Sequence, residues 1–169
     1  MPNLARLTLT FLLFVMAVSP AIAQIDKARD QFLGDFKSYY DKMVSFAERE
    51  QRDSAYKASE DMEDAFDAMY NFSLDIPQKL NDNNLRELGS EAQEFIDAMN
   101  SFKEKAGTLR GKLLKVGEDY GAELSDVKRE YANVQGKFNL LWLNFQKTGK
   151  DIGNKHKAIK QTCTSGCLP

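Results

Sequence analysis

Residues 85–120 read LRELGSEAQEFIDAMNSFKEKAGTLRGKLLKVGEDY, and apolar side chains recur along them at alternating steps of three and four. This heptad pattern is typical of a long amphipathic helix whose apolar face packs against another helix. The members of the pattern are Leu85, Leu88, Ala92, Phe95, Met99, Phe102, Ala106, Leu109, Leu113, Val116 and Tyr120.

A second apolar pattern follows Tyr120. In it, every other apolar residue lies one position later than the first pattern would place it. It consists of Leu124, Val127, Tyr131, Val134, Phe138, Leu141 and Phe145. Gly117 and Gly121 lie where the pattern shifts, and glycine favours a turn. We therefore predict two antiparallel helices, at about 90–116 and 122–154, joined at 117–121. Gly107 and Gly111 lie inside the first of these helices, where they either weaken it or permit close packing.

Two further helical patterns precede this stretch. The first, from about Ile25 to Arg52, presents Phe32, Phe36, Tyr39, Met43 and Phe46 on one face. The second presents Ala55, Ala58, Met62, Ala65, Met69, Phe72 and Ile76. The frame slips near Asp53 and Ser54, either of which can cap a new helix. We predict a turn at residues 50–54, with one kinked helix as the alternative.

The clearest break in the chain lies between these two helical pairs. Pro77 and the cluster Asn81-Asp82-Asn83-Asn84 are strong turn signals. Leu85 and Leu88 fit one short helical turn that ends at Gly89. Ser90 and Gln93 then fit a capping box that starts the next helix.

Four helical segments and no alternating strand pattern predict an all-α fold. The segment lengths favour an elongated four-helix up-down bundle with coiled-coil-like heptad packing. A long helical hairpin or a dimeric coiled coil is the alternative.

The first 23 residues have the pattern of a secretory signal peptide. Arg6 precedes an apolar run, and Ala21-Ile22-Ala23 supplies small residues at the cleavage positions before Gln24. We expect a secreted, extracellular protein without a transmembrane anchor. The predicted domains are the signal peptide at 1–23, the helical bundle at 24–160 and a cysteine-containing tail at 161–169.

The charge of the mature chain is small but uneven. Residues 24–169 hold 22 basic and 25 acidic side chains, a net charge of −3, which argues against a dedicated nucleic-acid-binding protein. Residues 24–76 carry a net −6 and residues 77–169 a net +3. The simplest explanation of this asymmetry is that the charges lie on solvated helix faces. Alternatively, the opposite charges help the two halves of the chain to fold together, or help two molecules to pair head to tail.

Two modifications are predicted for an exported chain. Cys163 and Cys167 are expected to form a disulfide in an oxidising compartment, within one chain or between two. Asn71-Phe72-Ser73 is a glycosylation sequon, which predicts a glycan on Asn71 in a eukaryotic secreted protein.

The sequence carries no catalytic or metal-binding motif. His156 is the single histidine, and neither zinc-type nor di-metal spacings accompany it. The acidic run at 60–67 lacks the glycine-centred ligand spacing of a calcium loop. We expect a non-enzymatic protein without a cofactor.

The densest apolar patch is FNLLWLNF at 138–145, which is apolar most of the way around a helix. It predicts either a deeply buried segment or a contact site for a protein partner, a second copy or a lipid. The candidate contact residues are Tyr131, Phe138, Leu141, Trp142 and Phe145. We expect function by protein binding or self-association. The alternative is an extracellular carrier of lipid or another small apolar ligand. It would act through an interior lined by methionine and phenylalanine, or through amphipathic helices that open onto lipid surfaces.

Overall fold

The computed structural model describes the backbone of residues 27–74, 76–77 and 86–166, and the side chains of 27–74, 76–77 and 88–148. The predicted signal peptide at 1–23, the Asn/Asp cluster of the predicted break at 81–84 and Leu85 lie outside the described residues. Every regular element within the described parts is helical. The elements are the π-helix η1 (Phe32–Phe36), α2 (Lys37–Glu48), α3 (Arg52–Ser73), α5 (Arg86–Leu113) and α6 (Gly121–Gly166).

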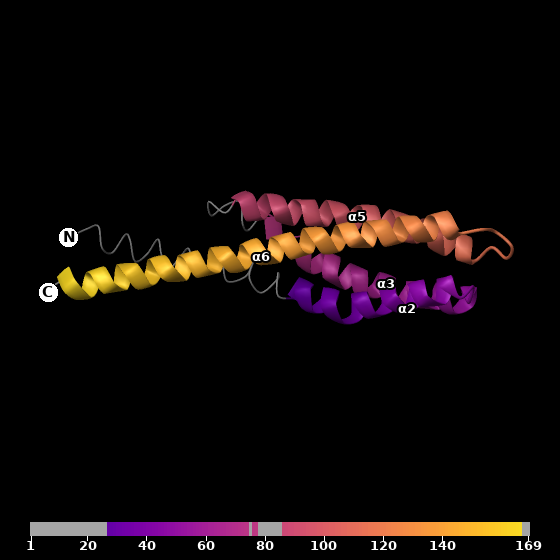
Figure 1. Cartoon of the computed structure of the whole chain (residues 1–169), viewed down its shortest axis with the longest axis horizontal. Coiled ribbons are helices and arrows are strands. Elements are labelled where there is room, and N and C mark those ends of the chain that lie inside the picture. Colours follow the sequence, from indigo (N-terminus) through magenta and orange to yellow (C-terminus); the bar gives the residue numbers. More distant parts are fainter. Residues whose placement is uncertain (1–26, 75, 78–85, 167–169) are drawn as a thin grey trace.

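The helices form the predicted all-α, up-down four-helix bundle (Figure 1). Residues 27–48 make one continuous helical segment, and α2 packs on α3, α3 on α5 and α5 on α6. The first segment also reaches α6 through aromatic side chains, since the Tyr40 and Tyr131 rings stack 3.6 Å apart. These contacts close the bundle around one core.

The predicted apolar faces of α3, α5 and α6 supply most of that core. Phe66, Phe95 and Phe102 are fully buried, as are the methionines of these helices. The shifted pattern after Tyr120 is also confirmed, because its members from Leu124 to Leu141 are buried. Large, tightly packed apolar side chains of this kind provide the main driving force for folding.

The predicted core face of the first helix is confirmed at Phe32, Phe36 and Met43 and is wrong at its other two positions. Its buried residues are Ala28, Phe32, Phe36, Tyr40, Met43 and Ala47, whereas Tyr39 and Phe46 are only partly buried. The reason is the π-helical turn η1, in which the backbone hydrogen bonds span five residues. In this wider turn, residues four positions apart stay on the side that faces the core. In an ordinary α-helix, successive four-residue steps would turn them away from it.

The turn between the first two helical segments lies at residues 49–51, close to the predicted 50–54. Glu50 adopts a φ of 60°, and the Gln51 amide donates to the Phe46 carbonyl. The predicted cap is wrong: Gln51 occupies the N-cap position of α3 and no side chain caps it.

The start of α5 differs from the prediction. The helix begins by Arg86 and continues through Gly89 and Ser90, so neither residue marks a boundary. Gln93 donates a hydrogen bond to Asp97 on the next turn instead of capping a helix start. The heptad pattern of α5 continues across this point, and the resulting burial outweighs the local stop signal.

The connection between α5 and α6 lies where the glycines predicted it. Helix α5 ends at Leu113, α6 begins at Gly121, and Gly117 has a φ of 85°, which favours glycine. Val116 was expected on the apolar face but falls in this loop and is 96% exposed.

The last helix is longer than predicted. Its 46 residues correspond to about 69 Å at 1.5 Å per residue, whereas the 28 residues of α5 correspond to about 42 Å. Figure 1 shows α6 projecting past the other labelled helices towards the C-terminus. The expected end near Asn154 and the expected boundary at 160/161 both fall inside this helix.

Candidate functional site

The five predicted contact residues of α6 divide into two groups. Tyr131, Phe138 and Leu141 are buried in the bundle core. Trp142 and Phe145 are partly buried, with ring centroids 5.7 Å apart. Only these last two retain surface that a partner can touch in this arrangement, and the predicted contact itself stays a prediction.

Trp142 lies beside the first helical segment. The guanidinium of Arg29 stacks on the indole, 4.8 Å from the ring centroid. On the α5 side of the same helix, Asn144 donates a hydrogen bond to Glu91. A cation over an aromatic face is attracted by the negative face of the ring, so Arg29 holds the indole in a defined orientation at the end of the core.

Leu140 and Leu143 have a different environment from their neighbours. Their exposed fractions are 44% and 61%, so they lie on the outer side of α6 and not in the core. The apolar character of 138–145 therefore has two parts, a buried seam and an exposed pair of leucines. Both leucines belong to the apolar run at 138–145, but they were not among the five predicted contact residues.

Tyr131 contributes a buried hydroxyl to the centre of the bundle. Its oxygen has no hydrogen-bond partner among the described protein atoms, and its ring lies nearly parallel to that of Tyr40, at 6°. Burial raises the pKa of Tyr131 and raises that of Tyr40 to about 12, and Asp41 adds to both shifts. Both phenols therefore remain neutral at physiological pH.

Arg52 joins the turn at 49–51 to the loop at 114–120. Its guanidinium donates to the carbonyls of Lys112 at 3.1 Å, Lys115 at 2.9 Å and Glu118. It also stacks on the Tyr120 ring at 4.5 Å. One α3 side chain thus donates to the Lys112 carbonyl in the last turn of α5 and to two carbonyls of the loop that follows. The Lys112 and Lys115 carbonyls also accept a backbone amide.

The same end of the bundle carries a hollow of about 510 Å³ between the turn and the loop. Two of its acidic side chains already pair with lysines: Glu48 with Lys128, and Glu118 with Lys112. Tyr120 closes its inner side by donating a hydrogen bond to the Ala47 carbonyl at 2.7 Å. These contacts explain the polar lining as the closure of the bundle end.

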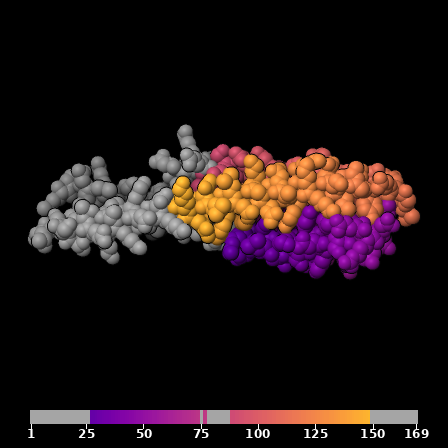
Figure 2. All heavy atoms as spheres, in the orientation of Figure 1, coloured from indigo at the N-terminus to yellow at the C-terminus, as the bar shows by residue number. Residues whose placement is uncertain are grey.

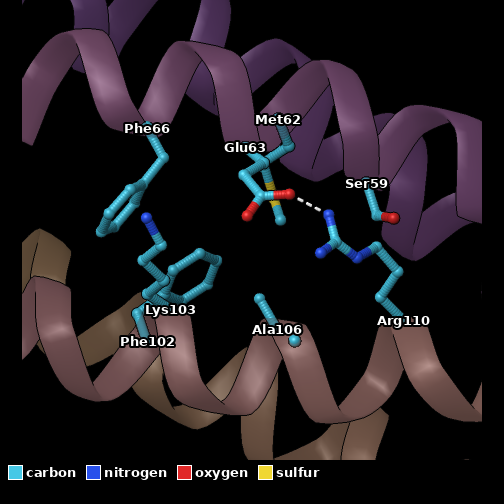
Figure 3. Close-up of a pocket in the computed structure, with 9 residues that line it drawn as sticks. Ser59, Met62, Glu63, Phe66, Phe102, Lys103, Ala106 and Arg110 are labelled. Atoms are coloured by element: carbon cyan, nitrogen blue, oxygen red, sulfur yellow. Dashed lines mark hydrogen bonds and ion pairs between the residues drawn. The ribbon is translucent and has the colours of Figure 1, made fainter.

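A second cavity, between α3 and α5, is far smaller. Figure 3 shows Met62, Phe66 and Phe102 around it, with Arg110 of α5 reaching across to pair with Glu63 of α3. Its volume of about 20 Å³ is roughly that of one water molecule. Ligand pockets are more commonly about 300–1,000 Å³, so this cavity accommodates no apolar ligand.

Among the described side chains, no three His, Cys, Asp or Glu residues come together as metal ligands. No helix within the described part of the chain is long and apolar enough to cross a bilayer. Asn71 is exposed in the last turn of α3, while the Ser73 hydroxyl of the same sequon is buried and donates to the Met69 carbonyl at 2.9 Å.

The backbone of α6 includes Cys163, but its side chain and all of Cys167 lie outside the described residues. The predicted disulfide therefore stays a prediction. Comparisons of the chain with protein-family models, with curated proteins and with solved structures found no match.

Proposed function

We propose that this chain is an exported, non-enzymatic helical protein that works by binding another protein through the exposed side of α6. The observation that carries the proposal is the exposure of Leu140 and Leu143 on a helix whose opposite face already fills the core. Exposed apolar side chains grouped on one element are typical of interaction surfaces.

The position of these leucines supports a protein partner. They lie on the outside of α6, a helix held to α5 by the Glu94–Lys137 ion pair at 2.7 Å. Trp142 is fixed nearby by Arg29. A rigid aromatic side chain loses little conformational entropy on binding, which suits Trp142 to a protein interface.

The packing of the interior gives less support to a carrier of apolar ligands. The phenylalanine and methionine side chains that were considered as a cavity lining are buried against one another. Phe36 and Phe102, for example, meet edge to face at 5.4 Å. The filled core favours function through the surface of the bundle and not through its interior.

Photo-cross-linking tests the proposed surface. A photoreactive amino acid at position 143 is expected to yield a discrete protein adduct when the protein is isolated from its own secretion route. The matched control is position 114, because Leu114 is 62% exposed but lies in the loop after α5. Equal labelling at both positions, or lipid adducts alone at 143, would contradict the proposal.

Trp142 separates the two functions by fluorescence, since it is the single tryptophan. We expect its emission to be unchanged by liposomes and fatty acids, because the indole is already packed between Arg29 and Phe145. A blue shift on adding either would support the carrier function instead.

A further inference from the structure

We infer that the outer face of α6 docks a second copy of this chain, with the two α6 helices antiparallel. This inference rests on the proposed function and names its partner. The two copies would present the same face to each other, which is the arrangement of a twofold-symmetric dimer.

The outer face forms a second seam on the side of α6 opposite the core. Helical geometry places residues at steps of three and four on one side, and the steps from Arg129 to Lys147 follow this rule. The exposed members of the face are Arg129, Ala132, Asn133, Gly136, Asn139, Leu140, Leu143 and Lys147. The core residues Val134, Phe138 and Leu141 point the other way. Figure 2 shows α6, in orange to gold, exposed along the face turned to the viewer.

This face is unusual in its lack of charge. The structure describes every residue from Arg129 to Lys147, and between these two the exposed face carries no charged side chain. Lys137 lies on the α5 side, where it pairs with Glu94. In a chain that is 28% charged, about four uncharged turns leave two identical faces free of mutual repulsion.

Charge along α6 and its preceding loop selects the partner and its direction. Residues 118–130 hold five acidic and two basic side chains, a net of −3, whereas residues 147–166 hold five lysines and one aspartate, a net of +4. Antiparallel pairing brings Lys147 of one copy towards the acidic start of α6 in the other. Parallel pairing places like charges together, which is unfavourable.

Gly136 lies near the middle of the outer face. A Cβ added there would meet nothing within 4 Å, so packing within one chain does not require glycine. Glycine inside a helix is unfavourable relative to alanine, whereas a crossing at Gly136 would let two backbones approach closely. With that crossing, Leu140 of one copy meets Ala132 of the other and Lys147 comes beside Ser125 and Asp126.

Sedimentation velocity of the full secreted chain, over a wide range of concentrations, tests this inference. We expect a monomer–dimer equilibrium that weakens with salt, because exposed opposite charges are screened. The double variant Leu140→Gln/Leu143→Gln should weaken dimerisation at least ~10-fold, since it removes apolar area from the contact. The matched control is Leu33→Gln/Leu114→Gln, which alters two leucines that are similarly exposed elsewhere and should leave dimerisation unchanged.

A glycine pair distinguishes docking from a general change in helix stability. Gly136→Ala and Gly107→Ala both add a methyl group where one chain offers open space, so both should raise the unfolding midpoint. Only Gly136→Ala should weaken the dimer.

Direction is tested by mixing copies labelled at position 125 with copies labelled at 147. The mixture should give a short distance between labels on different copies, and the copies labelled only at 147 a long one. The reverse result would overturn the antiparallel arrangement.

A single chain at every concentration, or a dimer insensitive to Leu140→Gln/Leu143→Gln, would overturn the inference. If such a monomer still forms an adduct with a different protein at position 143, the inference fails and the proposed function stands. If it forms no protein adduct at all, both fail.

Discussion

Arg52 illustrates how one side chain fixes the closed end of the bundle. It contacts carbonyls 60, 63 and 66 residues further along the chain, and thus links the two helical hairpins. Hydrogen bonds from a charged group are stronger than neutral ones, and a fork-shaped guanidinium reaches several acceptors at once.

Replacing Arg52 with alanine should therefore destabilise the protein by about 2 kcal/mol, because three carbonyls lose a charged donor and the Tyr120 ring loses the guanidinium stacked on it. Urea unfolding monitored by circular dichroism measures the change. The matched control is Lys57→Ala, which removes a positive charge from an exposed site on the same helix and should change stability by less than ~0.5 kcal/mol. Equal effects of the two variants would mean that the carbonyl contacts are unimportant.

Replacing Tyr131 is expected to raise the stability of the protein, in contrast to replacing Arg52. The Tyr131 hydroxyl is buried without a partner among the described side chains and backbone, so Tyr131→Phe removes an unfavourable group while keeping the ring that stacks on Tyr40. We expect stability to rise by about 1 kcal/mol. A clear loss of stability would show that the hydroxyl makes a favourable contact.

The same two tyrosines predict loss of stability in alkali. Burial raises the folded-state pKa of Tyr40 from 10.0 to about 12 and raises that of Tyr131 as well. Because the unfolded chain deprotonates first, the stability that the neutral tyrosines contribute is complete below pH 10. It is lost as the pH rises towards 12. Thermal unfolding over this range should show a steeper decline for the native chain than for Tyr131→Phe. Identical slopes would contradict the prediction.

At the scale of elements, the structure resolves an ambiguity about the α5 glycines. A Cβ at Gly107 or Gly111 would meet nothing within 4 Å, so these residues weaken the helix and do not serve close packing within the chain. Each change to alanine should stabilise the protein by about 1 kcal/mol. Gly117→Ala is the contrasting control: its φ of 85° strains any side chain, and it should destabilise the protein. Thermal unfolding of the three variants checks the sign of each.

The heptad patterns predicted α5, α6 and their connection because apolar burial at steps of three and four dominates the energetics of such helices. They failed where local backbone geometry changed. The π-turn at Phe32–Phe36 shifted the buried positions to Tyr40 and Ala47. A π-turn is not predicted by the glycine and proline signals that indicate ordinary turns. The helix stop predicted at Gly89 failed because tertiary packing outweighed a weak local signal.

At the scale of the whole molecule, the all-α bundle was predictable and its surface only partly so. Contacts such as Arg52 to the 114–120 loop join positions more than 60 residues apart, and no local pattern reveals them. The outer face of α6 did leave a signal, since Lys137 is the sole charged residue from 131 to 146. That signal was overlooked because the buried seam accounted for most of the same apolar residues.

The central claim is that the protein functions through the outside of α6 and not through its interior. Native mass spectrometry of the protein isolated from its natural source distinguishes these two possibilities. We expect an assembly heavier by at least one protein chain, which Leu140→Gln/Leu143→Gln dissociates. A single chain that carries lipid-sized ligands, unaffected by this double variant, would contradict it.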